Sequence, residues 1–372
     1  MNLRIAGMGW VTPLGRGIDP VWNRLIRGEE ATAEPISDQI SDKSYCAFRI
    51  PSEALKDLPP NPRLRRASAI SRFAAAAGVD ALADAKSTIG EIDVQRMALV
   101  FAASNGGVIY TKRFYHNVVE AGAQSASPLL FPETVFNAPA SHLAAILGIE
   151  GASYTLVGDG AVGVLAMKMA IDLLNNELFD FCLVVGAEEA DWLLCDAYHK
   201  WRLLKNEPPI DLFHKPPRGM ILSEGAGAVL LAREGTVQID EVDAGGNFSQ
   251  RREANGIVRR ILHDLADQDA CIVASANGTF IDLAERAAIE KELPRAIVYS
   301  PKSALGESVG ASAVWQIIAA AQALRTKRLP QMLHSDPEIA LSFPTIDEIP
   351  GRRAIVLSCG LNQQVAGLRL SI

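Results

Sequence analysis

Residues 154–174 read YTLVGDGAVGVLAMKMAIDLL, and residues 296–324 read AIVYSPKSALGESVGASAVWQIIAAAQAL. Each stretch begins with an apolar run typical of a strand, passes through a glycine-containing turn and ends in an alanine-rich segment with helical periodicity. This repetition predicts two similar halves. Glycines interrupt the pattern between residues 234 and 250, so we place the boundary there and predict halves over residues 1–240 and 241–372.

Short apolar runs and helical segments alternate along the rest of the chain. The runs are dense in valine, isoleucine and leucine without polar alternation, as in strands that are covered on both faces. The alternation predicts a layered α/β protein. The expected strands are residues 3–8, 97–103, 153–157, 181–186, 227–232, 271–274, 296–299 and 353–357. The expected helices are residues 20–27, 67–85, 138–147, 161–176, 255–266, 281–291 and 308–326.

The composition argues against several classes of protein. The chain has 372 residues, of which 49% are hydrophobic, and a formal net charge of −7, which is a poor fit to nucleic-acid binding. Its five cysteines show no CxxC spacing, so we predict neither a disulfide framework nor a metal site. We find no signal-peptide pattern and no apolar stretch of the ~20 residues that a membrane span needs. We therefore expect a reduced, cytoplasmic protein with no membrane partner.

One short motif points to nucleotide binding. Gly158, Gly160 and Gly163 form a GxGxxG pattern between an expected strand and an expected helix. Such glycines let a pyrophosphate approach a helix N-terminus. Glu188 and Glu189, at the end of the next strand, offer a ribose ligand but come about 25–30 residues after the motif rather than about 20. Nucleotide binding is therefore kept as a minor alternative.

A longer series of motifs resembles the β-ketoacyl-acyl-carrier-protein synthase (ketosynthase) family. The blocks follow one another in the family's order over nearly the full chain, which makes the match specific. They are GMGWVTPLG at residues 7–15, RF at 72–73, SNGG at 104–107, Pro132 with Asn137, GASY at 151–154, VGAE at 185–188, SEGAG at 223–227, KS at 302–303 with Gly306, and GLN at 360–362.

The resemblance implies both a fold and a chemistry. The fold is thiolase-like, with two similar βαβαβαββ halves in a five-layered αβαβα arrangement. In the family, a cysteine at a helix N-terminus takes the acyl chain as a thioester, and the helix dipole and backbone N–H groups favour its thiolate and the oxyanion. Two histidines then assist the loss of CO2 from malonyl-carrier protein.

The resemblance places other residues at all three catalytic positions. Gly160 stands at the cysteine position, Asn277 at the first histidine and Glu307 at the second. Glycine cannot form a thioester, so condensation by the family's mechanism is excluded. The family's active-site lysine is retained as Lys302, and Glu285 is its candidate acidic partner, with Glu307 as a second candidate.

The substrate entrance departs from the family pattern as well. Ser358 occupies the position of the family's gating phenylalanine, and the segment after Asn277 is shorter than the usual one. That segment helps to line the pantetheine tunnel in the family. Both departures argue against substrate entry through this subunit.

The resemblance also implies a partner. Related systems pair an active ketosynthase with a catalytically dead paralogue, the chain-length factor of type II polyketide synthases, whose side chains limit the depth of the acyl cavity. We therefore predict a non-catalytic subunit that pairs with an active ketosynthase in fatty-acid or type II polyketide (including polyene) biosynthesis. Its ligand would be an acyl chain on the phosphopantetheine of an acyl carrier protein, with no other cofactor. Such factors often carry glutamine at the cysteine position, so Gly160 is a departure.

The family's geometry nominates surfaces for these partners. We expect residues 131–137 and 153–157 at the dimer surface, and residues 111–122 near the partner's cavity. Arg63, Arg65 and Arg66 form the densest basic cluster, and basic residues here dock the acidic carrier protein in the family.

An altered enzyme is the alternative. If Asp159, Asn277 and Glu307 converge, their mutual repulsion would raise the pKa of an acid. Such a site would suit a stand-alone acyl-carrier-protein or acyl-CoA hydrolase or transferase that uses water as the nucleophile. The loss of the cysteine and both histidines together favours the non-catalytic subunit.

Overall fold

One long sheet runs through both halves of the computed structural model, which describes residues 2–38, 42–267, 269–345 and 351–372. Within these ranges the sheet has 11 strands in the order β12-β11-β13-β14-β10-β1-β9-β7-β5-β6, with β2 paired to β1 at the side. The N-terminal half supplies β1 (Arg4–Thr12), β2 (Gly15–Arg16), β5 (Met97–Ala103), β6 (Ser153–Val157), β7 (Phe181–Glu188) and β9 (Gly225–Ala232). The C-terminal half supplies β10 (Val237–Asn247), β11 (Cys271–Val273), β12 (Val298–Tyr299), β13 (Arg353–Cys359) and β14 (Gln364–Ser371).

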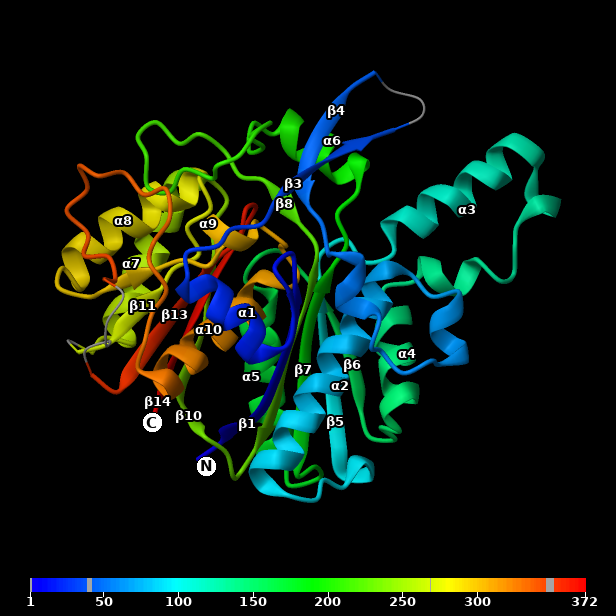
Figure 1. Ribbon diagram of the computed structural model, residues 1–372, viewed down its shortest axis with the longest axis horizontal. Helices are drawn as coiled ribbons and strands as arrows, with labels where there is room; N and C mark the ends of the chain where they lie inside the picture. The colour runs from blue at the N-terminus through cyan, green and yellow to red at the C-terminus, as the bar shows by residue number, and fades with distance from the viewer. Residues whose placement is uncertain (1, 39–41, 268, 346–350) are drawn as a thin grey trace.

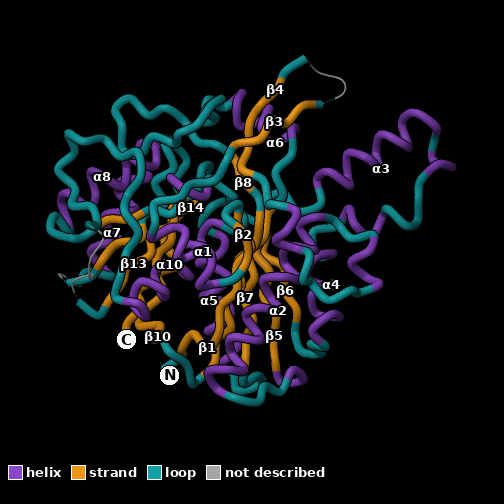
Figure 2. The backbone as a smooth tube through the Cα atoms, in the orientation of Figure 1, coloured by secondary structure: helices purple, strands orange, loops and turns teal. Residues whose placement is uncertain are grey.

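Helices form three layers around the two halves of this sheet (Figures 1 and 2). The central layer is α5 (Val162–Asn175) and α10 (Ser312–Thr326), which contact each other and strands of both halves. The result is the expected five-layered α/β arrangement. The outer layers are α2 (Ala69–Ile89) and α4 (Ala138–Leu147) on the N-terminal side and α7 (Ala254–Asp264) and α8 (Phe280–Glu292) on the C-terminal side.

Helix α10 of the central layer is rich in alanine and enclosed by protein. In α10, every side chain from Ser312 to Leu324 is buried. Gln316, in the middle of this helix, donates from Nε2 to the carbonyls of Ala274 (2.8 Å) and Leu357 (2.7 Å), so its amide nitrogen is satisfied. The position of α10 in turn fixes the loops at its N-terminus, where the candidate site lies.

The expected boundary between the halves lies within a strand. Residues 237–247 form β10, which pairs with both β1 and β14 and so makes the sheet continuous. The register of β10 with β14 shifts between Asp243 and Gly246, and Gly245 has φ +68°. The glycines therefore mark a β-bulge rather than a break in the pattern.

Several elements lack a clear sequence signal. Helix α3 (Val108–Ala121) has no buried residue, and no helix was predicted there. In Figure 1 it projects from the body of the molecule. The other elements that the sequence patterns missed are β2, β14, α6 (Trp192–Lys200), the short α9 (Lys302–Leu305), and the small sheet of β3 (Ala33–Ser37), β4 (Ser44–Phe48) and β8 (Leu222–Ser223).

The first helix begins slightly earlier than expected, as α1 (Ile18–Ile26). No helix among the described residues is both long and apolar enough to cross a membrane.

Two helical glycines test the packing of the central layer. A Cβ on Gly163 of α5 would lie 2.8 Å from Ala313 Cβ and 3.0 Å from Val314 Cγ2 of α10, whereas a Cβ on Gly256 of α7 would meet nothing within 4 Å. We expect Gly163→Ala to lower the free energy of unfolding by about 1–3 kcal/mol through overpacking. The matched control Gly256→Ala should raise it by about 0.5–1 kcal/mol through helix propensity. Denaturant titration measures both values, and equal signs for the two variants would contradict the packing argument.

Candidate functional site

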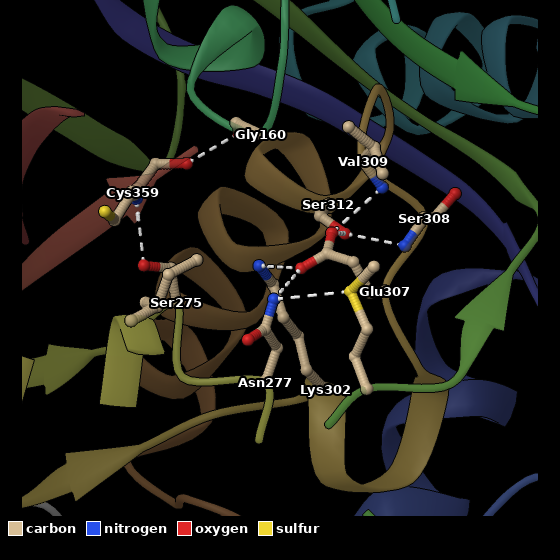
Figure 3. Close-up of polar contacts among 12 residues, drawn as sticks. Gly160, Ser275, Asn277, Lys302, Glu307, Ser308, Val309, Ser312 and Cys359 are labelled. Atoms are coloured by element: carbon tan, nitrogen blue, oxygen red, sulfur yellow. Dashed lines mark hydrogen bonds and ion pairs between the residues drawn. The ribbon is translucent and has the colours of Figure 1, made fainter. Parts of the chain in front are cut away.

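Gly160, Asn277 and Glu307, which the family resemblance assigns to the three catalytic positions, lie near one another (Figure 3). Gly160 precedes α5, Asn277 follows β11, and Glu307 lies between α9 and α10. Asn277 Nδ2 donates to Glu307 Oε2 at 2.7 Å. Asn277 and Glu307 are fully buried, and Gly160 is buried beside them.

The carboxylate of Glu307 is fully engaged. Its Oε2 accepts from Lys302 Nζ at 2.7 Å as well as from Asn277, and its Oε1 accepts from Ser312 Oγ (2.6 Å) and Val309 N (2.9 Å). Burial by itself would raise the pKa of Glu307. The Lys302 ammonium and the hydrogen bonds from Ser312 and Asn277 outweigh burial and hold the pKa below its usual value. Glu307 is therefore a carboxylate whose hydrogen-bonding capacity is used within the protein.

Lys302 pairs with Glu307 and not with Glu285, which sequence analysis took as its first candidate partner. Lys302 and Glu307 side chains are each only 2% exposed. Glu285 instead accepts at Oε1 from Ser275 Oγ (2.5 Å) and Ser275 N (2.9 Å). Position 307 carries an acid here, and the turn between α9 and α10 brings it directly to the ammonium group.

Asn277 is held by the turn that starts α8. Thr279 Oγ1 donates to Asn277 Oδ1 at 2.6 Å, and the backbone N–H groups of Asn277 and Gly278 donate to Asp282 Oδ1. Since its oxygen is already taken, the Asn277 side chain can only present its NH2 group to Glu307. An amide in this position can neither accept a proton nor carry a positive charge.

The end of β13 lies against Gly160, and it includes Ser358, which the resemblance assigns to the gating position. Ser358 Oγ donates to the Gly160 carbonyl at 2.7 Å, and Cys359 N donates to Ser275 Oγ at 2.9 Å. A Cβ on Gly160 would lie 3.2 Å from the Cys359 carbonyl oxygen and 3.4 Å from Gly360 Cα. A side chain at position 160 therefore requires a small shift of the backbone at Cys359 and Gly360.

The expected acidic cluster is only partly realised. Asn277 and Glu307 touch, but Asp159 points to the loop that follows β13, where its Oδ2 accepts from the backbone N–H of Asn362 (2.9 Å) and Gln363 (3.2 Å). Burial, more than the charge of Glu307, raises the pKa of Asp159. The pKa of Glu307 is lowered, so the expected rise by mutual repulsion does not occur at Glu307.

The GxGxxG glycines serve packing inside the protein. Gly163 packs against α10, and Gly160 packs against Cys359 at the end of β13. Glu188 is 2% exposed, and its Oε2 accepts from the backbone N–H groups of Ser104 (3.0 Å) and Asn105 (3.2 Å). A ribose cannot reach a carboxylate enclosed in this way, so the nucleotide alternative has no support at this residue.

The surfaces nominated for partners are exposed. Strand β6 is the last strand of the sheet order, with Tyr154 43% and Val157 53% exposed. Phe131 (55%) lies in the segment 131–137, and Tyr115 (68%) and Val119 (60%) lie on α3. The docking candidates Arg63, Arg65 and Arg66 are exposed just before α2.

Sequence reasoning missed two serines that complete the site. Ser312 donates to Glu307, and Ser275 links Glu285 to Cys359. Serines of this kind carry no spacing signal of their own. Only the approach of β11, β13 and α10 brings them to the two carboxylates.

The chain belongs to the beta-ketoacyl synthase family. It matches the N-terminal domain of that family over residues 2–236 and the C-terminal domain over residues 244–336. A relative by sequence is the 3-oxoacyl-[acyl-carrier-protein] synthase 2 of Synechocystis sp., which is 25% identical over 397 aligned positions that cover 96% of this chain and 93% of the relative.

Solved structures share the thiolase-like ketosynthase fold. A beta-ketoacyl synthase from Burkholderia phymatum superimposes with a TM-score of 0.84 at 19% identity, covering 100% of this chain and 99% of the other. A structure of the ketosynthase ApeO in complex with its chain length factor ApeC, from Xenorhabdus doucetiae, gives 0.82 at 17% identity, covering 100% and 98%. At this identity the likeness establishes the fold.

Removing one partner of the buried ion pair should destabilise the protein strongly. Glu307→Ala leaves the Lys302 ammonium buried without a counter-charge, and we expect a loss of about 3–5 kcal/mol in the free energy of unfolding. The double variant Lys302→Met with Glu307→Leu removes both charges and should recover most of that loss. Denaturant titration of the single and double variants measures the coupling. Additive losses would contradict a direct pair.

Stability should fall as the pH rises from about 5 to about 8. Burial raises the pKa of Glu188 to about 8, of Glu285 to about 7 and of Asp282 to about 6. Unfolded carboxyls lose their protons near pH 4, so over this interval the native state binds more protons than the unfolded state. Each such group lowers the free energy of unfolding by about 1.4 kcal/mol per pH unit until its folded pKa is passed. Denaturant titration across this interval should show a smaller slope for Glu188→Gln and an unchanged slope for the exposed control Glu91→Gln.

Proposed function

We propose that this chain is a non-catalytic ketosynthase-like subunit, a chain-length factor, that pairs with an active β-ketoacyl-acyl-carrier-protein synthase and shapes its acyl cavity. The pathway would be fatty-acid or type II polyketide biosynthesis, including polyenes. The proposal rests on the identity of the residues that stand at the family's catalytic positions. A glycine, an amide and an ion-paired carboxylate occupy them.

The chemistry of the site supports a structural role. Condensation needs a nucleophile and groups that stabilise an enolate oxygen as it develops negative charge. Gly160 provides no nucleophile, and Glu307 would repel an enolate. The nearby cation, Lys302, is already neutralised by Glu307 at 2.7 Å. These residues stabilise the subunit instead.

The exposed edge of the sheet supports a partner. Strand β6 is a sheet edge whose Tyr154 and Val157 side chains are partly exposed. An unpaired edge strand with apolar side chains is a template for pairing with another chain. Phe131 and Tyr115 extend the apolar surface toward the projecting α3, which suits a wall of the partner's cavity. The complex of ApeO with ApeC supports such a pairing by analogy of fold.

The basic cluster supports contact with an acidic carrier protein. Leu64 anchors the short turn that carries Arg63, Arg65 and Arg66, while these three side chains face solvent. Exposed cations on an otherwise acidic chain attract an acidic partner and increase its association rate. The acyl chain would arrive on the phosphopantetheine of that carrier.

A stand-alone acyl hydrolase or transferase is the alternative, and Asp159 is the observation that favours it. Burial raises the pKa of this acid, as in many general bases. Two backbone N–H groups occupy its Oδ2, however, so the pairing function fits the contacts better.

The test is the native mass of the chain produced alone and together with a ketosynthase from the same source. We expect a stable pair, and β-ketoacyl product from acyl- and malonyl-carrier protein only when the ketosynthase is present. Val157→Asp should abolish the pair by placing a charge on the β6 edge. The matched control Leu178→Asp, at a 70% exposed site outside the nominated segments 111–122, 131–137 and 153–157, should leave the pair intact.

Two results would overturn this proposal. One is a homodimer that ignores the ketosynthase. The other is product made by the purified chain alone. Release of free acid from acyl-CoA by the chain alone, lost in Asp159→Asn, would establish the alternative.

A further inference from the structure

Glu133 is a buried carboxylate in an exposed segment. It is the buried residue of the short turn Phe131–Thr134 and is 7% exposed, whereas Phe131 is 55% exposed. Charged side chains are almost never buried unless they are paired, and phenylalanine is usually inside. The usual arrangement is therefore reversed here, and the acid is the side chain that attaches this turn to the body of the protein.

The Glu133 carboxylate joins the turn to two helices. Its Oε1 lies 2.6 Å from Nε2 of His142 on α4, and its Oε2 accepts from the backbone N–H of Ser68, just before α2, at 3.1 Å. Burial by itself would raise the pKa of Glu133, but the hydrogen bonds from His142 and Ser68 outweigh burial and lower the pKa. Both oxygens of an ionised carboxylate are therefore held in fixed directions.

The segment 131–137 also packs closely on two glycines at the start of α3. A Cβ on Gly107 would lie 2.2 Å from the Glu133 carbonyl oxygen. A Cβ on Gly106, which has φ +55°, would lie 2.6 Å from Phe136 Cδ1. A larger residue at either glycine would push the segment away from the body. The carboxylate and the two glycines together fix where residues 131–137 lie.

The position of α3 depends on the same segment. The helix has no buried residue of its own and projects from the molecule in Figure 1. Thr111 Oγ1 of α3 donates to the Thr134 carbonyl at 3.3 Å, and the rings of Phe114 and Phe131 lie 5.7 Å apart. A shift of residues 131–137 would therefore remove contacts that support α3.

The segment and α3 present apolar side chains to solvent. The exposed side chains are Leu129 (68%), Phe131 (55%), Val135 (39%), Phe136 (46%), and, on α3, Tyr115 (68%) and Val119 (60%). Apolar groups gathered on a surface mark a site of protein association. This is the surface to which the function proposed above assigns the ketosynthase, and Glu133 anchors it on its buried side.

We propose that Glu133 is a positioning residue that sets the orientation of the partner-binding surface formed by residues 131–137 and α3. The identity of the partner rests on the proposed function, whereas the anchoring is a property of this chain alone. A carboxylate held by two directional hydrogen bonds favours one orientation of the segment, while an apolar side chain at position 133 would leave it free to shift. Glu133 takes no part in chemistry and acts through the residues that meet the partner.

Hydrogen exchange followed by mass spectrometry tests the anchoring in the full chain. Glu133→Ala removes both hydrogen bonds, so peptides that cover residues 108–121 and 127–137 should exchange at least about tenfold faster, with β5 and β7 unchanged. Glu133→Gln keeps an acceptor oxygen for the N–H of Ser68 and should restore most of the protection.

A second carboxylate provides the matched control. Glu292 of α8, whose side chain is 18% exposed, pairs with Arg259 at 3.0 Å in the C-terminal half of the chain. Glu292→Ala should leave exchange in residues 108–137 unchanged.

The same variants test the positioning role through the affinity for the ketosynthase. The dissociation constant of the pair should rise at least about tenfold in Glu133→Ala, because the partner must then order the surface as it binds. It should stay within about threefold of the parent value in Glu133→Gln and in Glu292→Ala. A residue that only stabilised the fold would change the free energy of unfolding and leave this constant unchanged.

Parent-like exchange of residues 108–137 in Glu133→Ala refutes the anchoring. So does faster exchange that appears only in step with β5 and β7, because that pattern reports general unfolding. Faster exchange with an unchanged dissociation constant refutes the positioning role. If Glu133→Ala does not fold, His142→Ala removes one of the two contacts and must accelerate exchange in the same peptides. A parent chain that forms no pair overturns the proposed pairing, and the exchange measurement then still decides the anchoring.

Discussion

The ion pair between Lys302 and Glu307 is the interaction on which the rest of the site depends. Both charges are removed from solvent, and such a pair is tolerated only when its remaining hydrogen-bonding groups are satisfied. The protein meets this requirement with Ser312 and Val309 N at the start of α10 and with Asn277 after β11. The pair therefore ties the central helix to the C-terminal strands, where an active member of the family holds a histidine instead.

Glu307 also determines the charge of the buried site. Lys302 at 2.7 Å is the counter-charge of its carboxylate and, together with hydrogen bonds from Ser312 and Asn277, lowers its pKa in spite of burial. Ser312, the first residue of α10, donates from its side chain to the same carboxylate, so the position of the helix is linked to the ion pair.

The sequence predicted the layers well because the strands and helices that form them are strongly apolar and periodic. The β6–α5 unit and the α10 helix lie where the repeated pattern placed them. Strand β10 was not predicted, because the glycines of its β-bulge interrupt the apolar pattern, and α3, which has no buried face, was missed as well.

For the site, the resemblance to the family nominated Gly160, Asn277 and Glu307, and the structure brings these residues together, but their partners could not be predicted from the sequence. Whether Lys302 meets Glu285 or Glu307 depends on a turn of a few residues, and both acids lie at plausible positions. The serines at 275 and 312 act through tertiary contacts that no spacing rule describes.

The open edge at β6 also has a consequence for how such a chain is produced in a cell. A copy synthesised in excess presents Tyr154 and Val157 on an unpaired strand to every other unpaired copy. Such strands recruit one another into aggregates, and quality-control proteases remove chains that remain exposed. In a two-subunit system, balanced synthesis of the partners therefore protects each of them. Under the proposed pairing, the amount of this chain that accumulates is set by the supply of the partner subunit as much as by its own rate of translation.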